Sequence, residues 1–294
     1  RKWEQMEAFA QHGVVGQQPT HGLDWCSGKG HVGRYLAQQG QALTCLEYDP
    51  ALVNAGKVLS QRHAPQAQHH AQDVMAPDAI RHLTAHTTPV ALHACGDLHV
   101  RLLRQVQQAS CPQLAMAPCC YNRISTDHYQ PLSVAANNSA LQLSRDDLSL
   151  PLSETVTAGL REQRLRDQSM AWRLAFDLLQ RDIRKSNEYW PTPSLSSTWL
   201  KQPFAEYIEH LAQYKELSLP SNLNYPAWEQ RGWRRLNHVR QLETVRHLFR
   251  RALELWLLLD RVLYLCEAGY QVQLGEFCPH ELTPRNLLIV AQKR

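Results

Sequence analysis

The chain has 294 residues, of which 44% are hydrophobic and 20% charged, a composition that excludes collagen, coiled coil and wholesale disorder. Its 31 Lys and Arg against 27 Asp and Glu give a net charge of +4, which by itself selects no partner. The eight cysteines show no Cys-x-x-Cys spacing, so we expect reduced thiols in a cytoplasmic protein. The longest apolar stretch falls short of the roughly 20 residues that span a bilayer, so no membrane segment is expected.

Strand and helix patterns alternate over the first 120 residues. Asp49 suits the N-cap of one helix and Pro50 its first position. Alternation of this kind indicates βαβ units and a parallel sheet, and therefore an α/β fold. The expected strands are 22–26, 42–47, 66–73, 89–94 and 114–117, and the expected helices are 31–39, 50–62 and 98–108.

The alternation stops near Tyr121. Proline-rich breaks and helical patterns follow, and a strand pair is expected at the end of the chain. The simplest account is a sheet domain formed by 1–120 and 241–294, interrupted by a mostly helical insertion, 121–240. Within the insertion, helices are expected at 160–186 and 204–214. After it, a helix is expected at 242–267 and the final strands at 271–277 and 286–291.

Positive charge gathers in residues 161–251. This window holds 16 Lys and Arg against 10 Asp and Glu, a net of +6, so the remainder of the chain carries −2. Five of the eight tryptophans lie in the same window: Trp172, Trp190, Trp199, Trp228 and Trp233. Basic and aromatic side chains together can hold phosphates and stack on bases. A solvated helix face over a Trp-rich core explains the same pattern, and both interpretations stay open.

A glycine-rich segment joins the first strand to the first helix. Gly28, Gly30 and Gly33 fit the pattern G-x-G-x-x-G, which brings backbone N–H groups close to a ligand but is shared by nicotinamide and flavin enzymes. Two acids make the prediction of a ligand more specific: Asp24 ends the first strand and Glu47 ends the second. Asp24 would repel the phosphates of a dinucleotide, whereas it would stabilise the ammonium group of a phosphate-free cofactor. Glu47 is placed to bind a ribose diol.

The segment Asp24-Trp25-Cys26-Ser27-Gly28-Lys29-Gly30 resembles motif I, D-x-G-x-G-x-G, of the class I S-adenosylmethionine-dependent methyltransferases, with Cys26 in place of the first glycine. The resemblance implies a Rossmann-like sheet of seven strands whose last pair is antiparallel, and S-adenosylmethionine as the cofactor. By resemblance Glu47 holds the ribose hydroxyls and Asp73 meets the adenine amine. The cofactor-binding residues expected from the motif and its neighbours are Asp24, Cys26, Ser27, Gly28, Gly30, His31, Glu47, Tyr48, Asp73, Val74, His93, Ala94 and Cys95.

Three further segments look like one methyltransferase-domain family: His93 to Leu98, Pro118 to Tyr121 and Thr283 to Asn286. The first two are also similar to segments of tRNA ribose methyltransferases, which carry Cys-Cys-His-His where this chain has Cys-Cys-Tyr-Asn. The positive charge of the helical insertion makes RNA the first candidate acceptor, with the insertion as the surface that recognises it. A protein side chain or a small molecule is the alternative acceptor.

Candidate residues for the transfer step follow the fourth and fifth strands. Asp97 is placed to remove a proton from the acceptor or to cap the following helix, and Tyr121 and Asn122 to orient the acceptor. Cys95, Cys119, Cys120 and His93 are possible zinc ligands, but adjacent cysteines rarely both reach one tetrahedral ion, so no metal is expected. A nicotinamide-dependent oxidoreductase and a non-catalytic cofactor-binding module remain the alternatives of another class.

Overall fold

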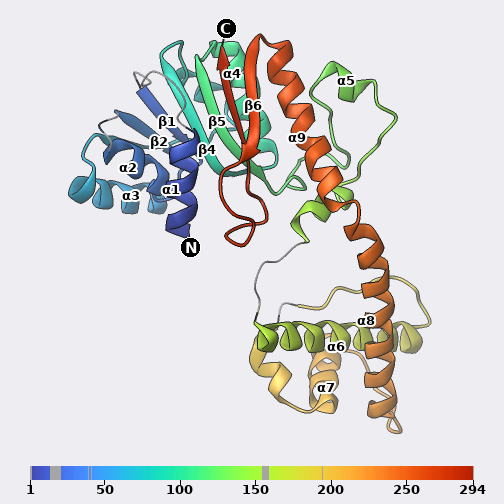
Figure 1. Ribbon diagram of the computed structural model, residues 1–294. Helices are drawn as coiled ribbons and strands as arrows, with labels where there is room; N and C mark the ends of the chain where they lie inside the picture. Colours follow the sequence, from blue (N-terminus) through green and yellow to red (C-terminus); the bar gives the residue numbers. More distant parts are fainter. Residues whose placement is uncertain are drawn as a thin grey trace. The chain divides into compact units, whose positions relative to one another are not determined.

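The computed structural model describes residues 2–13, 21–38, 40, 42–153, 159–193 and 195–293 (Figure 1). The chain forms two compact units, one of Arg1–Val156 with Arg250–Arg294 and one of Thr157–Phe249. The expected insertion began at 121 and ended at 240, whereas residues 121–153 pack with the sheet. Among the described residues, no helix has both the length and the apolar character needed to cross a membrane.

The first unit is built on one sheet of seven strands in the order β3-β2-β1-β4-β5-β7-β6. Five strands run parallel, and β7 is antiparallel to its neighbours β5 and β6, which confirms the predicted Rossmann-like sheet with an antiparallel last pair. The strands are β1 (His21–Trp25), β2 (Leu43–Glu47), β3 (Ala67–Ala71), β4 (Thr87–Cys95), β5 (Gln113–Cys119), β6 (Tyr270–Glu276) and β7 (Leu287–Lys293).

Helices cover both faces of this sheet, because successive side chains of each buried strand point to opposite faces. Leu23 and Trp25 of β1 pack into the core on the α4 and α9 face, while Leu43 and Cys45 of β2 pack on the α1 and α2 face. Figure 1 shows α1, α2 and α3 on the near side of the sheet. The helices are α1 (Lys2–Gly13), α2 (His31–Gln38), α3 (Pro50–His63), α4 (Asp97–Ala109) and α9 (Arg250–Glu267), with a 3-10 turn at Pro77–His82.

The predicted start of α3 is confirmed. The side chain of Asp49 accepts a hydrogen bond from the Ala51 N–H, and Pro50 is the first helical residue. Helix α1 was not predicted from the sequence. It buries only Phe9, Ala10 and Gly13, which leaves too short an apolar stripe to stand out in a polar segment.

Residues 121–153 form an irregular segment fastened to α9. The Asp260 carboxylate accepts hydrogen bonds from the Tyr129 hydroxyl at 2.5 Å and from the N–H groups of Leu132 and Ser133. Tyr121, Tyr129, Leu143, Leu148 and Leu257 form a small core beneath the segment. It contains α5 (Val134–Asn137) and a 3-10 turn, Asp147–Leu152.

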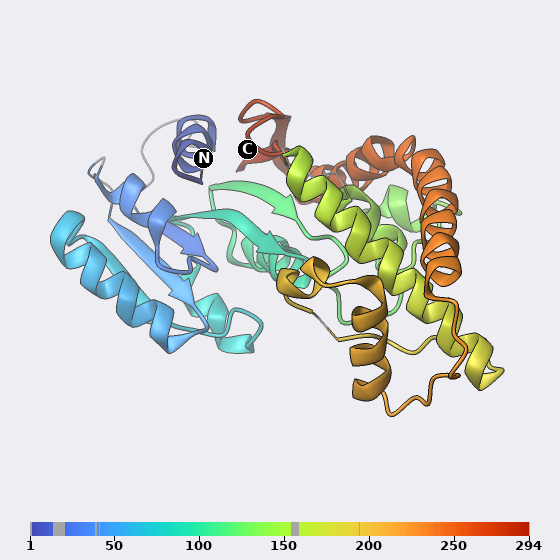
Figure 2. The same cartoon turned by 90° about the horizontal axis from the view of Figure 1, so that it is seen from below.

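The second unit is mostly helical, as predicted, with α6 (Leu160–Arg184), α7 (Phe204–Tyr214), α8 (Tyr225–His247) and a 3-10 turn, Ser197–Lys201 (Figure 2). The single helix expected at 242–267 is instead two helices, because α8 ends at His247 and α9 begins at Arg250. Most of α8 was not predicted. Its buried residues are only Trp228, Gly232 and Leu236, spaced four apart, and the rest of the helix is rich in arginine.

Candidate active site

A tight turn follows β1 and shapes the candidate site. Cys26, Gly28 and Gly30 all have positive φ angles, of 59°, 57° and 68°. Glycine adopts this conformation readily, but Cys26 does not, and such strained residues gather at functional sites. The Ser27 N–H donates to the Leu46 carbonyl at 2.9 Å, which holds the turn against the end of β2.

One cavity, of about 430 Å³, opens on the α1 side of this turn. We call it the Asp24 cavity. It is lined by six of the residues predicted to bind the cofactor: Asp24, Cys26, Ser27, Gly28, His31 and His93. Its wall also contains residues that the sequence did not indicate, namely Lys2, Trp3, Gln5 and Met6 of α1, with Lys29, Val32 and Leu92.

A second cavity, of about 510 Å³, lies at the ends of β2 and β3. We call it the Glu47 cavity. Cys26 lines both cavities, so they meet at the turn. The predicted residues Cys26, Glu47, Tyr48, Asp73 and Val74 line the Glu47 cavity, together with Leu46, Gln72, Met75 and Leu98.

Asp24 is only 3% exposed. Its Oδ2 accepts a hydrogen bond from the Gly33 N–H at the start of α2, at 2.9 Å. Burial raises the pKa of Asp24 to about 7, and the Gly33 N–H and the nearby Arg34 guanidinium oppose that rise. The carboxyl group is therefore poised to ionise near neutral pH, when a cation approaches it.

Glu47 holds the glycine turn in place. Its Oε2 accepts from the Gly28 N–H at 2.8 Å and its Oε1 from the Asp49 N–H at 3.0 Å, so backbone N–H groups hold both carboxylate oxygens. Asp73 is exposed, and its Oδ1 accepts from the Met75 N–H at 2.9 Å. Tyr48, which also lines this cavity, is 74% exposed.

Three of the residues predicted to bind the cofactor, Gly30, Ala94 and Cys95, do not line either cavity. A Cβ on Gly30 would lie 2.3 Å from Cε1 of His69, so this glycine makes room for a buried histidine. Ala94 is buried in the core on the α4 face. The roles of these three residues in binding stay predictions.

Cys95 belongs to a cluster of three thiols at the ends of β4 and β5. The Sγ atoms of Cys95, Cys119 and Cys120 all lie within 4.8 Å of one another, and those of Cys95 and Cys119 are 3.4 Å apart. A hydrogen bond from Cys119, another from Cys95, and the charges of Arg123 and Arg285 lower the pKa of Cys120 to about 5. The sulfurs are close enough to ligate one thiophilic ion, and the expectation that no metal binds stays a prediction.

Of the three residues predicted to serve the transfer step, Tyr121 and Asn122 lie in the loop after β5, and Asp97 at the start of α4 contacts that loop; only Asp97 lines a described cavity. The Asp97 Oδ2 accepts from the Ser125 N–H at 2.8 Å, and its N–H donates to the Arg123 carbonyl, so this residue ties the loop after β5 to α4. Tyr121 is 1% exposed, with its ring packed against His99 and Arg261. Asn122 has a buried Oδ1 without a hydrogen-bond partner in the described structure.

The two cavities suit a cofactor with a nucleoside at one end and an amino acid at the other. Among its described lining residues, the Glu47 cavity has two acids and no Lys, Arg or His, which favours a neutral nucleoside over a phosphate. The Asp24 cavity offers a buried carboxyl group together with Lys2 and Lys29, a set that complements an ammonium and a carboxylate. A Cβ at Gly28 would meet nothing within 4 Å, so the turn leaves free space there.

Comparison with known proteins gives the family of this part of the chain. Residues 1–127 match a family model described as a methyltransferase domain. Partial likenesses to solved structures include a TehB-like SAM-dependent methyltransferase from Corynebacterium glutamicum (19% identity, TM-score 0.31), with 38% of this chain and 60% of that chain covered. Another is the Pyrococcus abyssi tRNA (uracil-54, C5)-methyltransferase (18% identity, TM-score 0.33). That likeness covers 40% of this chain and 28% of the other chain. The chain thus spans less than two thirds of the length of these two structures. By the family-model match, residues 1–127 are similar to a methyltransferase domain.

Proposed function

We propose that the chain is an S-adenosylmethionine-dependent methyltransferase with RNA as its acceptor. The observation that supports this most directly is the pair of cavities that meet at Cys26, one with a buried carboxyl group and one with two acids and no base. A dinucleotide is a poorer ligand for these cavities, because its phosphates would lie at the glycine turn beside the Asp24 carboxyl group. The same argument speaks against a nicotinamide-dependent oxidoreductase.

In this proposal each acid holds a different part of the cofactor. Asp24 pairs with the ammonium group, and Lys2 and Lys29 lie on the same cavity for the carboxylate. Glu47 keeps free lone pairs for the ribose hydroxyls beside the bonds that it accepts from Gly28 and Asp49. Asp73 takes the adenine amine. The cofactor, when bound, supplies an electrophilic methyl group.

The acceptor is positioned by the loop after β5 and the turn after β4. A Cβ on Gly96 would lie 1.8 Å from the Arg123 carbonyl oxygen, so glycine is required for the two segments to touch. Asp97 has one carboxylate oxygen engaged by Ser125, which leaves the other available to take a proton from the acceptor. The unpartnered Oδ1 of Asn122 is available to orient the acceptor by a hydrogen bond.

RNA is favoured over a protein acceptor by the surface of the second unit. Two cations contact the Trp190 ring: the Arg184 guanidinium lies 4.7 Å from the ring centre and the Lys215 ammonium 4.9 Å from it. On α8, Trp233 is 37% exposed among the exposed Arg231, Arg234 and Arg235. Such interleaving suits phosphates and stacked bases. The core accounts for Trp172 and Trp228, so these two tryptophans carry no weight in the argument.

Methyl transfer from a tritiated donor into fractionated RNA and protein tests the proposal. We expect label in RNA from the wild type and none from Asp24→Asn, with both proteins folded. Label in protein alone would replace RNA by a protein acceptor. Binding of S-adenosylhomocysteine with no transfer into any fraction would support a non-catalytic module instead.

The salt dependence of RNA binding tests the role of α8. Replacing Arg231, Arg234 and Arg235 together with Gln removes three cations that are available to contact phosphates, so the slope of log affinity against log salt should flatten by about 2. Arg62→Gln, an exposed change on α3 of the first unit, is the matched control and should leave the slope unchanged. An unchanged slope in the triple variant would assign RNA binding to another surface.

A further inference from the structure

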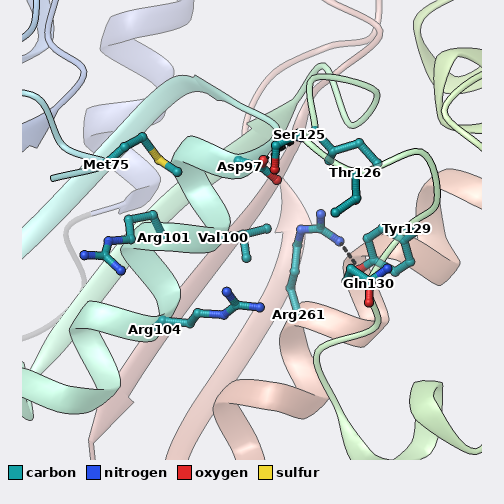
Figure 3. A pocket seen from close by; sticks show the side chains of 11 residues that line it. Met75, Asp97, Val100, Arg101, Arg104, Ser125, Thr126, Tyr129, Gln130 and Arg261 are labelled. Carbon is teal, nitrogen blue, oxygen red and sulfur yellow. Dashed lines mark hydrogen bonds between the residues drawn. The ribbon is translucent and has the colours of Figure 1, made fainter. Parts of the chain in front are cut away.

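A third cavity, of about 210 Å³, lies beside α4 and carries three arginines (Figure 3). Arg101 and Arg104 come from α4 and Arg261 from α9, and the loop 124–130 closes the other side. Met75 lines this cavity and also the Glu47 cavity, so the two adjoin. In the view of Figure 3, Arg104 extends toward Arg261, while Arg101 points away from both. We call this space the arginine cavity.

Arg261 is 1% exposed and forms no ion pair with a carboxylate in the described part of the chain. Neutral groups hold it: its Nε donates to His99 Nε2 at 2.9 Å, and its Nη1 to the Tyr129 hydroxyl at 3.1 Å and to the Leu257 carbonyl. Nη2 has no hydrogen-bond partner among the described residues. Buried charges are normally paired, so a guanidinium held in this way points to an anion from outside the chain.

The acids near the arginine cavity form no ion pair with its arginines in the described structure. Asp260 accepts hydrogen bonds from Tyr129, Leu132 and Ser133 and makes no ion pair with Arg261. Asp97, the one acid that lines the cavity, accepts from the Ser125 N–H. Neither Arg101 nor Arg104 makes an ion pair with an acid of the described structure. The cavity thus carries more positive than negative charge.

His99 is held as the neutral tautomer that can accept a hydrogen bond from Arg261. Its Nδ1 donates to the Ala94 carbonyl, which leaves Nε2 as the acceptor for Arg261. Burial and the neighbouring Arg261 charge lower the pKa of His99 well below its ordinary value, so the ring stays neutral. The guanidinium is therefore pre-oriented, with Nη2 as its free edge.

We propose that the arginine cavity binds a phosphate group of the acceptor RNA, with Arg261 at its base and Arg104 at its mouth. This inference rests on the proposed function, because it assigns the phosphate to the methyl acceptor. Guanidinium groups suit phosphate oxygens, and a phosphate anchored here would place the adjoining nucleotide near Asp97, which lines the same cavity. The cavity would thus set which part of the RNA reaches the site.

Calorimetry with inorganic phosphate at constant ionic strength tests the cavity, and Arg104→Gln is the variant. Because Arg104 is exposed, its replacement leaves the core intact. We expect phosphate to bind the wild type, and Arg104→Gln to bind it at least about fivefold more weakly. Arg62→Gln on α3 removes the same charge elsewhere and should bind phosphate like the wild type. Equal binding by all three proteins, or no binding by the wild type, would overturn the inference.

Two further measurements separate this inference from the proposed function. S-adenosylhomocysteine should bind Arg104→Gln as tightly as the wild type, while the KM for RNA rises and kcat stays nearly unchanged. Phosphate binding that needs Arg104 in a protein that does not bind S-adenosylhomocysteine would refute the proposed function and leave the anion site standing. Methyl transfer to RNA with an unchanged KM in Arg104→Gln would refute the assignment of the site to the acceptor.

Discussion

At the residue scale, Asp24 combines a structural and a proposed binding role in one carboxyl group. One oxygen fixes the start of α2 through Gly33, and the side chain lines the cavity where an ammonium group is expected. Truncation to Ala would leave the buried Gly33 N–H without an acceptor and so disturb the fold. Asn keeps an oxygen for that N–H and removes only the charge, which makes it the sharper variant.

The pKa of Asp24 predicts the pH dependence of cofactor binding. With a pKa of about 7 in the free protein, the carboxylate is mostly ionised above neutral pH and mostly protonated below it. Because only the ionised form pairs with an ammonium, S-adenosylhomocysteine should bind about tenfold more weakly near pH 6 than near pH 8. Calorimetry at several pH values measures this change. Asp24→Asn should bind weakly with little pH dependence, and a steep dependence retained in that variant would assign the titration to another group.

The thiol cluster makes a second prediction at this scale. The lowered pKa of Cys120 favours its thiolate form, while hydrogen bonds to Cys120 and Cys95 raise the pKa of Cys119. Iodoacetamide should therefore label Cys120 before the exposed Cys266, as read by mass spectrometry of the peptides. Replacing Cys120 with Ser (Cys120→Ser) should remove the fastest labelling event. Faster labelling of Cys266 would contradict the lowered pKa.

At the element scale, α8 depends on a glycine. A Cβ on Gly232 would lie 2.3 Å from the Ala171 carbonyl oxygen and 2.7 Å from the Ala175 Cβ, both on α6. We expect Gly232→Ala to destabilise the second unit by about 1–3 kcal/mol despite the better helix propensity of alanine. Hydrogen exchange of the α6 and α8 amides measures this effect. Asn237→Ala, an exposed change on the same helix, should be neutral or stabilising, and equal stability of the two variants would refute close packing at Gly232.

The same elements show how far the sequence alone reaches. The periodicity of 204–214 predicted the bounds of α7, whereas α8 was largely missed because its buried stripe is one residue wide and includes a glycine. In the site, Asp24 and Glu47 were predicted because each is an acid at the end of a predicted strand, next to the glycine-rich segment. The wall supplied by α1 was not, since tertiary packing brings Lys2 to Met6 to the cavity and no local pattern records it.

At the scale of the whole molecule, charge and chemistry are divided between the two units. The residues predicted to bind the cofactor and the candidate acceptor-site residues all lie in the first unit. Residues 157–249, the second unit, hold 14 Lys and Arg against 10 Asp and Glu, a net charge of +4. Within the first unit, acids line the Glu47 cavity and arginines the adjoining arginine cavity. An acceptor that carries phosphates would thus be repelled by the acids of the Glu47 cavity and attracted by the arginines of the arginine cavity. This charge pattern fits a nucleic acid better than a neutral peptide.

The buried His69 predicts that the sheet unit loses stability as the pH falls. His69 is 5% exposed, and its Nε2 shares a hydrogen bond with the Ser60 hydroxyl. Burial and the charges of Arg34 and Lys57 lower the pKa of His69 from 6.5 to about 4. The unfolded chain therefore takes up this proton first as the pH falls, and stability is lost between about pH 6.5 and pH 4.

The test compares the wild type with His69→Gln, which lacks the ionisable ring. Asp24 acts in the opposite direction, because its raised pKa favours the folded state at low pH, so only the difference between the two proteins isolates His69. Between about pH 6.5 and pH 5, the free energy of unfolding of the sheet unit should fall by about 1–2 kcal/mol more in the wild type than in the variant. Hydrogen exchange of β1 to β4 measures it for this unit alone. Parallel pH profiles would show that His69 takes up its proton equally in the folded and unfolded states.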